Sequence, residues 1–445
     1  MLNEDIFEDE YASEVEDTKA LAKAASSGGS FLIDKFRSML SKTKDIRQAK
    51  EAQSDVGYPT GSINFDFTNG TVVYVKNSEK NMNFKYYSLG VTDGSLVTII
   101  GRSGCGKTTW AIQTAATIVR PFPNSYVMHE DIEGGITEAR KQKLTDFYGE
   151  DFKKKFIVRN TGITNENFYQ RIKMLYDLKM MNYKDYEYDT GYYDSCGNRI
   201  FKLQPTVVLL DSVAVLMPEK YAEEEEMSGQ MSTTATAKAN NGLFKRIIPM
   251  LKSGNIILFA INHVRKKVEI NPFAHTKAQV AYLKPDEYLP GGDMAVYLAN
   301  TLLRFDDSKL KPDVYGIDGS MVDIHLLKSR TNGAGKYATM VFNQAEGFDN
   351  DLSTFVLLKE NDKIKGAGAY QYVDGHPEFK FTAKKFKALI QAEPEFRKIV
   401  SNTAFEVLSA KLEEEQYRES LEAEAKSNIG TDIYGMVMNM IPVSA

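Results

Sequence analysis

The 445-residue sequence has only two cysteines, Cys105 and Cys196. Two thiols cannot supply the cysteine framework of a small secreted domain, so we expect no disulfide scaffold and a reducing, cytoplasmic setting. No apolar run reaches the length of a membrane span, and the acidic N-terminus lacks the apolar core of a signal peptide. The sequence therefore predicts a soluble intracellular protein without a membrane partner.

Basic residues are not in excess either. Lys and Arg number 55 against 60 Asp and Glu, which gives a formal net charge of −5 at pH 7. This balance differs from that of a strongly basic nucleic-acid-binding protein, so any DNA contact must come from local patches. Hydrophobic residues make up 42% of the chain, which is ample for packed cores. The length corresponds to about two to three domains.

The segment 97–109 combines an apolar β-branched run, the pattern G-x-x-x-x-G-K-T and a helix-favouring sequence. This strand, glycine loop and helix predict a phosphate-binding loop, because backbone N–H groups and the helix N-terminus then face phosphate oxygens. An ordinary glycine-rich turn does not need the full pattern. We expect Lys107 to reach the β- and γ-phosphates and the Thr108 hydroxyl to hold Mg²⁺. The predicted nucleotide-binding residues of this segment are Gly101, Arg102, Ser103, Gly104, Cys105, Gly106, Lys107, Thr108 and Thr109.

Carboxylates follow the next apolar run, at 125–128. Glu130, Asp131 and Glu133 all precede a pair of glycines. In an open α/β sheet, ligands meet the carboxyl ends of the strands, and a carboxylate there can activate the attacking water. We predict that Glu133 has this role, with Glu130 and Asp131 as competitors. The alternative is that these acids merely begin a helix near Thr137.

Two further apolar runs also end in polar residues. The run 207–210 ends in Asp211, a pattern typical of the carboxylate that supports Mg²⁺ in nucleotide-binding proteins. The run 255–261 ends in Asn262 and His263. His263 has three interpretations: a core histidine, a catalytic base or a sensor of the γ-phosphate.

Two segments are candidates for DNA contact. Segment 218–236 is polar and is predicted to be a loop that precedes an amphipathic helix. Segment 264–290 begins with basic residues and lacks periodicity, and loops this long are usually functional or disordered. The alternative for its basic start is a solvated face. The candidate DNA-binding residues are Gly229, Gln230, Arg265, Lys266, Lys267, Lys277, Gly291 and Gly292.

Later segments complete the predicted sheet. Residues 294–305 and 321–327 are expected to be strands, and 337–342 the return strand of a hairpin. Lys328 and Arg330 stand beside a glycine-rich turn and suit a phosphate contact, either within the chain or from a neighbouring subunit.

Strands alternating with helices predict an α/β fold with a mostly parallel central sheet. Residues 1–56 are expected to form a helical or linker segment that docks on a neighbouring subunit, with a solvated tail as the alternative. Residues 57–348 are expected to form the ATPase core and 349–445 a small α-rich C-terminal region. Residues 182–200 are expected to be an inserted hairpin or loop, to which we assign no function.

The order and spacing of these motifs resemble the RecA family of homologous-recombination ATPases. Within that family, the sequence looks most like the phage UvsX group. The matching stretches are Thr60-Gly61-Ser62, 101–108, 131–137, 211–214, 260–263, Gly291-Gly292 and 328–331.

The resemblance implies a RecA-like core and a DNA-dependent ATPase that uses ATP and Mg²⁺. It implies helical filaments on single-stranded DNA, strand exchange with homologous double-stranded DNA, and help from a single-strand-binding protein and a mediator. A phage origin would place the protein in the cytoplasm of an infected bacterium. Segments 218–236 and 264–290 would be the DNA loops. The implied catalytic residues are Lys107, Glu133, His263, Lys328 and Arg330, and the implied metal-binding residues are Thr108 and Asp211.

Other functions stay open at this point. A RecA-fold hexameric DNA helicase or translocase shares the phosphate loop and the cations from a neighbouring subunit, but it forms closed rings. A recombination mediator binds DNA and ATP with negligible turnover. A small-molecule kinase is a more distant alternative.

Overall fold

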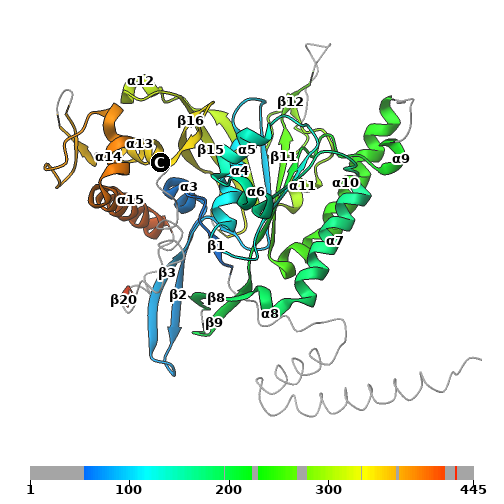
Figure 1. The fold of residues 1–445 in the computed structure, drawn as a ribbon, viewed down its shortest axis with the longest axis horizontal. Helices are drawn as coiled ribbons and strands as arrows, with labels where there is room; N and C mark the ends of the chain where they lie inside the picture. Colours follow the sequence, from blue (N-terminus) through cyan, green and yellow to red (C-terminus); the bar gives the residue numbers. More distant parts are fainter. Residues whose placement is uncertain are drawn as a thin grey trace, which may run out of the picture. The chain divides into compact units, whose positions relative to one another are not determined.

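A nine-stranded sheet forms the centre of the computed structural model (Figure 1). Its strand order is β17-β16-β15-β14-β5-β11-β10-β6-β7. The six strands from β14 to β7 are parallel, and β15, β16 and β17 continue the sheet in antiparallel pairs. The predicted α/β class with a mostly parallel sheet is therefore confirmed. The strands are β5 (Leu96–Gly101), β6 (Val127–Asp131), β7 (Phe156–Arg159), β10 (Thr206–Asp211), β11 (Ile256–His263), β14 (Thr301–Asp307), β15 (Ser320–Ser329), β16 (Lys336–Asn343) and β17 (Gly347–Asp349).

The structure describes residues 55–194, 196–222, 229–267, 278–331, 333–366, 370–415 and 426–427, which belong to one compact unit. The predicted docking segment 1–56 lies outside these residues except for its last two positions. Within the described ranges, no helix is both long and apolar enough to cross a membrane.

Helices cover both faces of the sheet, so its inner strands are buried on both sides. Alternate residues point to opposite faces, so Leu209 and Phe259 pack with α4, whereas Leu210 and Leu258 pack with α7 and α10. α7 and α10 lie side by side (Figure 1). The helices of the two layers are α4 (Lys107–Val119), α5 (Glu138–Thr145), α6 (Gly149–Lys155), α7 (Asn165–Met181), α10 (Gly229–Gly254) and α11 (Met294–Leu298).

Two hairpins extend from the amino-terminal ends of the parallel strands. The expected hairpin within 182–200 is present as β8 (Glu187–Tyr193) and β9 (Arg199–Leu203), preceded by α8 (Tyr183–Tyr186). It packs on the hairpin β2 (Thr71–Asn77) and β3 (Met82–Ser88), and the rings of Tyr86 and Tyr192 stack with their centroids 4.6 Å apart. A short ladder joins β1 (Gly57–Tyr58) to β4 (Val91–Thr92).

The C-terminal helices share a core with an early helix. Phe355, Phe386 and Phe396 are fully buried in one apolar cluster with Phe67 of α3. The domain boundaries at 57 and 349 stay a prediction. The elements of this part are α3 (Ile63–Thr68), α12 (Pro312–Tyr315), α13 (Asn350–Glu360), β18 (Ile364–Lys365), β19 (Tyr372–Val373), η1 (Ala383–Lys385), α14 (Phe386–Ala392), α15 (Pro394–Glu415) and β20 (Lys426–Ser427).

Two predicted segments differ from the structure. After the short α9 (Glu219–Ala222), helix α10 already begins at Gly229, so the loop prediction for 218–236 is wrong over its second half. Alanine is the best helix former, and serine and threonine cost a helix only about half a kcal/mol each, so this run does not exclude a helix. The strand prediction for 294–305 is wrong at its start, where α11 stands, because a short apolar run fits either element.

Candidate functional site

The candidate phosphate loop joins β5 to α4. β5 ends at Gly101 and α4 begins at Lys107. Gly106 has φ +83°, and a Cβ there would lie 2.9 Å from the ring of Phe348, so only glycine fits without a shift. No side chain caps the first N–H groups of α4, where Gly106 is the N-cap. The loop therefore has the backbone shape and the free helix N-terminus that favour an anion.

Lys107 lies inside the curl of this loop. Its Nζ donates to the carbonyl of Arg102 at 2.6 Å and lies 3.4 Å from Nδ1 of His263. The side chain is buried, and burial lowers its pKa. The ammonium is thus poorly solvated, which favours an added anion at this point.

Thr108 and Asp211 meet beside the loop. The Thr108 hydroxyl donates to Oδ2 of Asp211 at 2.5 Å. Asp211 is buried at the end of β10, and burial is the main cause that raises its pKa to about 6. Its second oxygen, Oδ1, is buried and has no hydrogen-bond partner among the described residues. A hydroxyl next to a carboxylate with an unused oxygen fits Mg²⁺, which prefers oxygen ligands.

Glu133 lies across the site from Lys107. Its carboxylate accepts a hydrogen bond from the Ser212 hydroxyl at 2.6 Å and lies 3.2 Å from Nε2 of His263. One ligand atom from each of Glu133, Asp211 and His263 falls within a cluster 4.8 Å across. Three strand ends, those of β6, β10 and β11, bring these groups together.

The two competing acids have other partners. Glu130 is fully buried and forms a bidentate ion pair with Arg171 of α7, at 2.7 and 2.8 Å. Asp131 binds the buried Lys141 at 2.6 Å and accepts from the N–H of Gly134 at 2.9 Å. Of the three acids, Glu133 is therefore the one directed at the loop.

The alternative that these acids begin a helix is wrong. β6 includes Glu130 and Asp131, and α5 starts only at Glu138, with Thr137 as its N-cap. The ion pair of Asp131 and Lys141 instead ties the turn that carries Glu133 to α5. The acids belong to the end of a strand because the pairing of β6 with β10 continues to Asp131.

His263 is half-buried at the end of β11, between Lys107 and Glu133. Burial and the adjacent ammonium both lower its pKa, so the ring is neutral near pH 7. A neutral ring that accepts from Lys107 through Nδ1 must carry its proton on Nε2, which then donates to Glu133. This tautomer is assigned from the hydrogen-bond network. With both ring nitrogens engaged in this way, the contacts fit a sensor better than a base or a core histidine.

Lys328 and Arg330 lie at the opposite end of the strands from the candidate phosphate loop. β15 runs antiparallel to β14, and Ser329 is opposite Thr301, the first residue of β14. The cations are therefore next to the amino ends of the parallel strands, whereas Lys107 follows the carboxyl end of β5. The structure does not bring them to the loop of their own chain.

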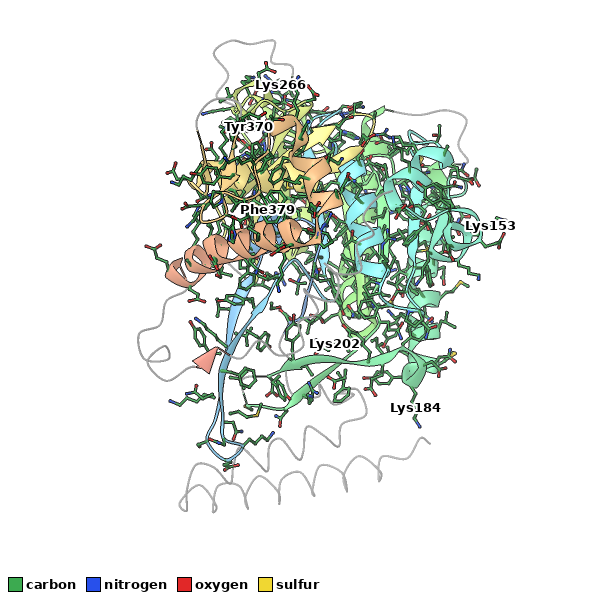
Figure 2. All side chains as sticks on the ribbon, turned by 60° about the vertical axis from the view of Figure 1, so that its left-hand side comes forward. Lys153, Lys184, Lys202, Lys266, Tyr370 and Phe379 are labelled. Carbon is green, nitrogen blue, oxygen red and sulfur yellow. The ribbon has the colours of Figure 1, made fainter. Side chains whose placement is uncertain are left out.

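The basic residues predicted to contact DNA directly after His263 lie near the carboxyl ends of the parallel strands. Arg265 and Lys266 are exposed on β12 (Arg265–Lys266), which pairs with β13 (Glu287–Tyr288). Lys267 follows, and its N–H donates to the carbonyl of Asp286. Figure 2 shows Lys266 at one end of the described part, far from Lys202 of β9.

The other DNA predictions have different surroundings. Gly229 and Gln230 are the first residues of α10, and Lys277 lies outside the described residues. Gly291 has φ +81°, and a Cβ there would lie 2.6 Å from the carbonyl oxygen of Val213. Gly291 therefore permits a close approach to the chain that follows Asp211; the neighbouring Gly292 also has a positive φ. This packing gives both glycines a structural reason.

Sequence reasoning assigned no role to Ser212, Asn262, Lys141 or Arg171. Ser212 directly follows a strand-end carboxylate, and Asn262 directly precedes His263, so their positions were visible signals. Lys141 and Arg171 left no local signal, because their partners lie 10 and 41 positions away.

Together, the fold and the site define an α/β protein whose parallel sheet carries a candidate phosphate loop and a carboxylate directed at it. No family model matches the chain, and no curated protein matches it. Among solved structures, the chain is similar to the crystal structure of the RadB recombinase, with a TM-score of 0.34 and 17% identity over 58% of this chain and 92% of that chain. A likeness of this size is too weak to assign a function, so the residues of the site must carry the assignment.

Proposed function

We propose that this chain is a RecA-like, DNA-dependent ATPase of homologous recombination. The observation that carries the proposal is the position of Glu133, which Ser212 and His263 hold opposite Lys107 and beside the pair of Thr108 and Asp211. These are the parts that phosphoryl transfer to water requires: a phosphate cradle, a metal-binding pair and a base.

Each group has a defined task in this proposal. Glu133 orients a water molecule for in-line attack on the γ-phosphorus and accepts its proton as the bond to the β-phosphate oxygen breaks. Ser212 and the Nε2–H of His263 hold the carboxylate in position. Lys107 and the loop N–H groups bind the phosphate oxygens. Mg²⁺, held by Thr108 and Asp211, supplies charge neutralisation at these oxygens when it is bound.

The far position of Lys328 and Arg330 supports a contact in trans. β5 rises about 3.3 Å per residue, so its amino end, beside which these cations lie, is roughly 15 Å from the loop at its carboxyl end. ATP bound at the loop of one subunit would then meet these cations from the next. Such head-to-tail contacts generate either an open helix or a closed ring.

DNA binding follows from the same arrangement. The exposed Arg265 and Lys266 begin two residues after His263, so phosphate contacts in a single strand lie close to the nucleotide. In the proposed filament, base pairing with a homologous duplex selects the sequence. The resemblance to the UvsX group, and the need for a single-strand-binding protein and a mediator, belong to this proposal.

The test combines imaging with turnover. Full-length protein is imaged by negative stain with single-stranded DNA and a non-hydrolysable ATP analogue, beside a nucleotide-free sample, and ATP hydrolysis is measured with and without DNA. Open helices that need nucleotide, DNA-stimulated hydrolysis and joint molecules with a homologous duplex are the expected results. Closed rings would favour the helicase, and ATP binding without turnover would favour the mediator.

A further inference from the structure

The basic strand β12 is paired with β13 through a very short ladder. Among the described residues, Arg265 is opposite Tyr288 and Lys266 is opposite Glu287, and the N–H of Lys267 continues this pairing by donating to the carbonyl of Asp286. A ladder of two pairs is marginal by itself. β12 also follows β11 directly, and the N–H of Val264 donates to the carbonyl of Gly101 at 3.1 Å, so what holds β13 adds to this connection in positioning the two cations.

A buried ion pair holds β13 to the central sheet. The guanidinium of Arg304 donates to both carboxylate oxygens of Glu287, at 2.7 and 2.8 Å, and a third bond runs to Asp306 at 2.7 Å. The Arg304 and Glu287 side chains are 8% and 2% exposed, so water screens this pair little. The hydrogen bonds from Arg304 are the main cause that lowers the pKa of Glu287 to about 2.

The ion pair also reaches the strand that ends in the candidate phosphate loop. Arg304 lies on β14, opposite Ile100, and the next residue is opposite Gly101. Ile100 is buried in a small apolar cluster under the hairpin, which includes Leu283 and Leu289. Thus β13 and the candidate phosphate loop are both attached to the neighbouring strands β5 and β14.

A second attachment runs on the other side of the hairpin. The Asn262 side chain donates to the carbonyl of Pro290 at 2.9 Å and accepts from the N–H of His263 at 2.8 Å. Asn240 of α10 donates to the carbonyl of Gly291 at 2.8 Å. The hairpin is therefore held next to His263 on one side and next to Gly101 on the other.

We propose that Arg304 is a positioning residue that couples nucleotide binding to DNA affinity by fixing Glu287, and through it Arg265 and Lys266. This inference rests on the proposed function. With the pair intact, a change at Gly101 or His263 moves the hairpin as one body. With the pair broken, the hairpin keeps its charges and its attachment beside His263, but loses its link to β14 and, through β14, to the strand that ends at Gly101.

The test is the ratio of DNA affinities in two nucleotide states. Dissociation constants for a fluorescent oligothymidylate are measured with a non-hydrolysable ATP analogue and with ADP, for wild type and Glu287→Gln. Coupling of this kind is worth roughly 5- to 150-fold in affinity. In the variant we expect the ratio to fall below about twofold. The DNA-free ATPase rate and the affinity in ADP stay at wild-type values.

Arg304→Lys is the milder second variant, because it keeps the charge but loses the bidentate geometry, and it should retain part of the ratio. Asp93→Asn is the matched control, because it breaks the buried ion pair of Asp93 and Lys202 at 2.9 Å, on the other side of the molecule. Its ratio should equal that of wild type.

The outcomes separate the two proposals. A wild-type ratio in Glu287→Gln overturns the positioning role, and so does an equal loss in Asp93→Asn or a parallel loss of ATP binding, since either would mark a general structural defect. If wild type itself shows no nucleotide-dependent DNA binding, the proposed function fails and the coupling fails with it.

Discussion

Removal of the Ser212 hydroxyl tests the catalytic arrangement most directly. Ser212→Ala deletes one short hydrogen bond, 2.6 Å long, to the Glu133 carboxylate and leaves the contact of Glu133 with His263. Ser212 is fully buried, so water cannot easily replace the lost donor. A hydrogen bond to a charged group is worth about 1.5–3 kcal/mol.

If that free energy holds Glu133 in its reactive position, turnover falls by about 10- to 150-fold, because each 1.36 kcal/mol corresponds to roughly tenfold in rate. Steady-state phosphate release in the presence of single-stranded DNA measures the turnover number, and a fluorescent ATP analogue measures binding. We expect the turnover number to fall with binding unchanged, since Ser212 touches the base and not the phosphate cradle.

Ser95→Ala is the matched control. Ser95 is also fully buried, directly before β5, and its hydroxyl donates at 2.6 Å to a neutral carbonyl, that of Thr92. This variant should lose some stability and keep its turnover number. Wild-type turnover in Ser212→Ala, or an equal loss in both variants, would refute the reasoning about Glu133.

Other substitutions test the remaining parts of the site. Glu133→Gln keeps ATP and DNA binding but loses hydrolysis by 100-fold or more, as an order-of-magnitude estimate, and gives longer-lived filaments in time-resolved imaging; normal turnover would remove Glu133 from its role. If Arg330 acts on the nucleotide of a neighbouring subunit, a mixture of the Lys107→Ala and Arg330→Ala proteins regains part of the ATPase activity that neither variant has alone. A mixture as inactive as the separate variants contradicts that contact. Lys141→Met leaves Asp131 as an uncompensated buried charge, so the thermal unfolding temperature falls below that of wild type. Burial raises the folded-state pKa of Asp211 from 3.8 to about 6, so its ionisation opposes folding as pH rises from about 4 to 6; Asp211→Asn therefore unfolds at a higher temperature than wild type at pH 7 and loses magnesium-dependent nucleotide binding.

Local patterns in the sequence predicted the elements around the site. The apolar run before Gly101, the glycine spacing and the following helix determine the candidate phosphate loop within thirteen consecutive residues, 97–109. The apolar runs that lead to Asp211 and His263 likewise indicated buried strands. In the structure each strand is covered by helices on both faces. These features depend on neighbours in the chain, so a single sequence carries them.

Distant pairings decided the rest. The sequence favoured Glu133 over Glu130 and Asp131 only because it stands just before the glycines, and it is the packing of α7 and α5 on β6 that gives the other two acids their partners, Arg171 and Lys141. The loop prediction for 218–236 was wrong from Gly229 onward, where α10 begins; α10 packs on α7 farther along its length, and the small differences in local propensity at its start do not exclude a helix.

The sequence by itself determined the class of fold and which residues follow each strand. Only the tertiary structure decided which of those residues meet, because strand order and register are set by contacts between residues far apart in the chain. β11 lies between β5 and β10, so His263 stands between Lys107 and Glu133. β15 is antiparallel to β14, so Lys328 and Arg330 lie next to the amino ends of the parallel strands, away from the candidate phosphate loop. The ion pair of Arg304 and Glu287, across 17 positions, exists only because β13 folds back on β14.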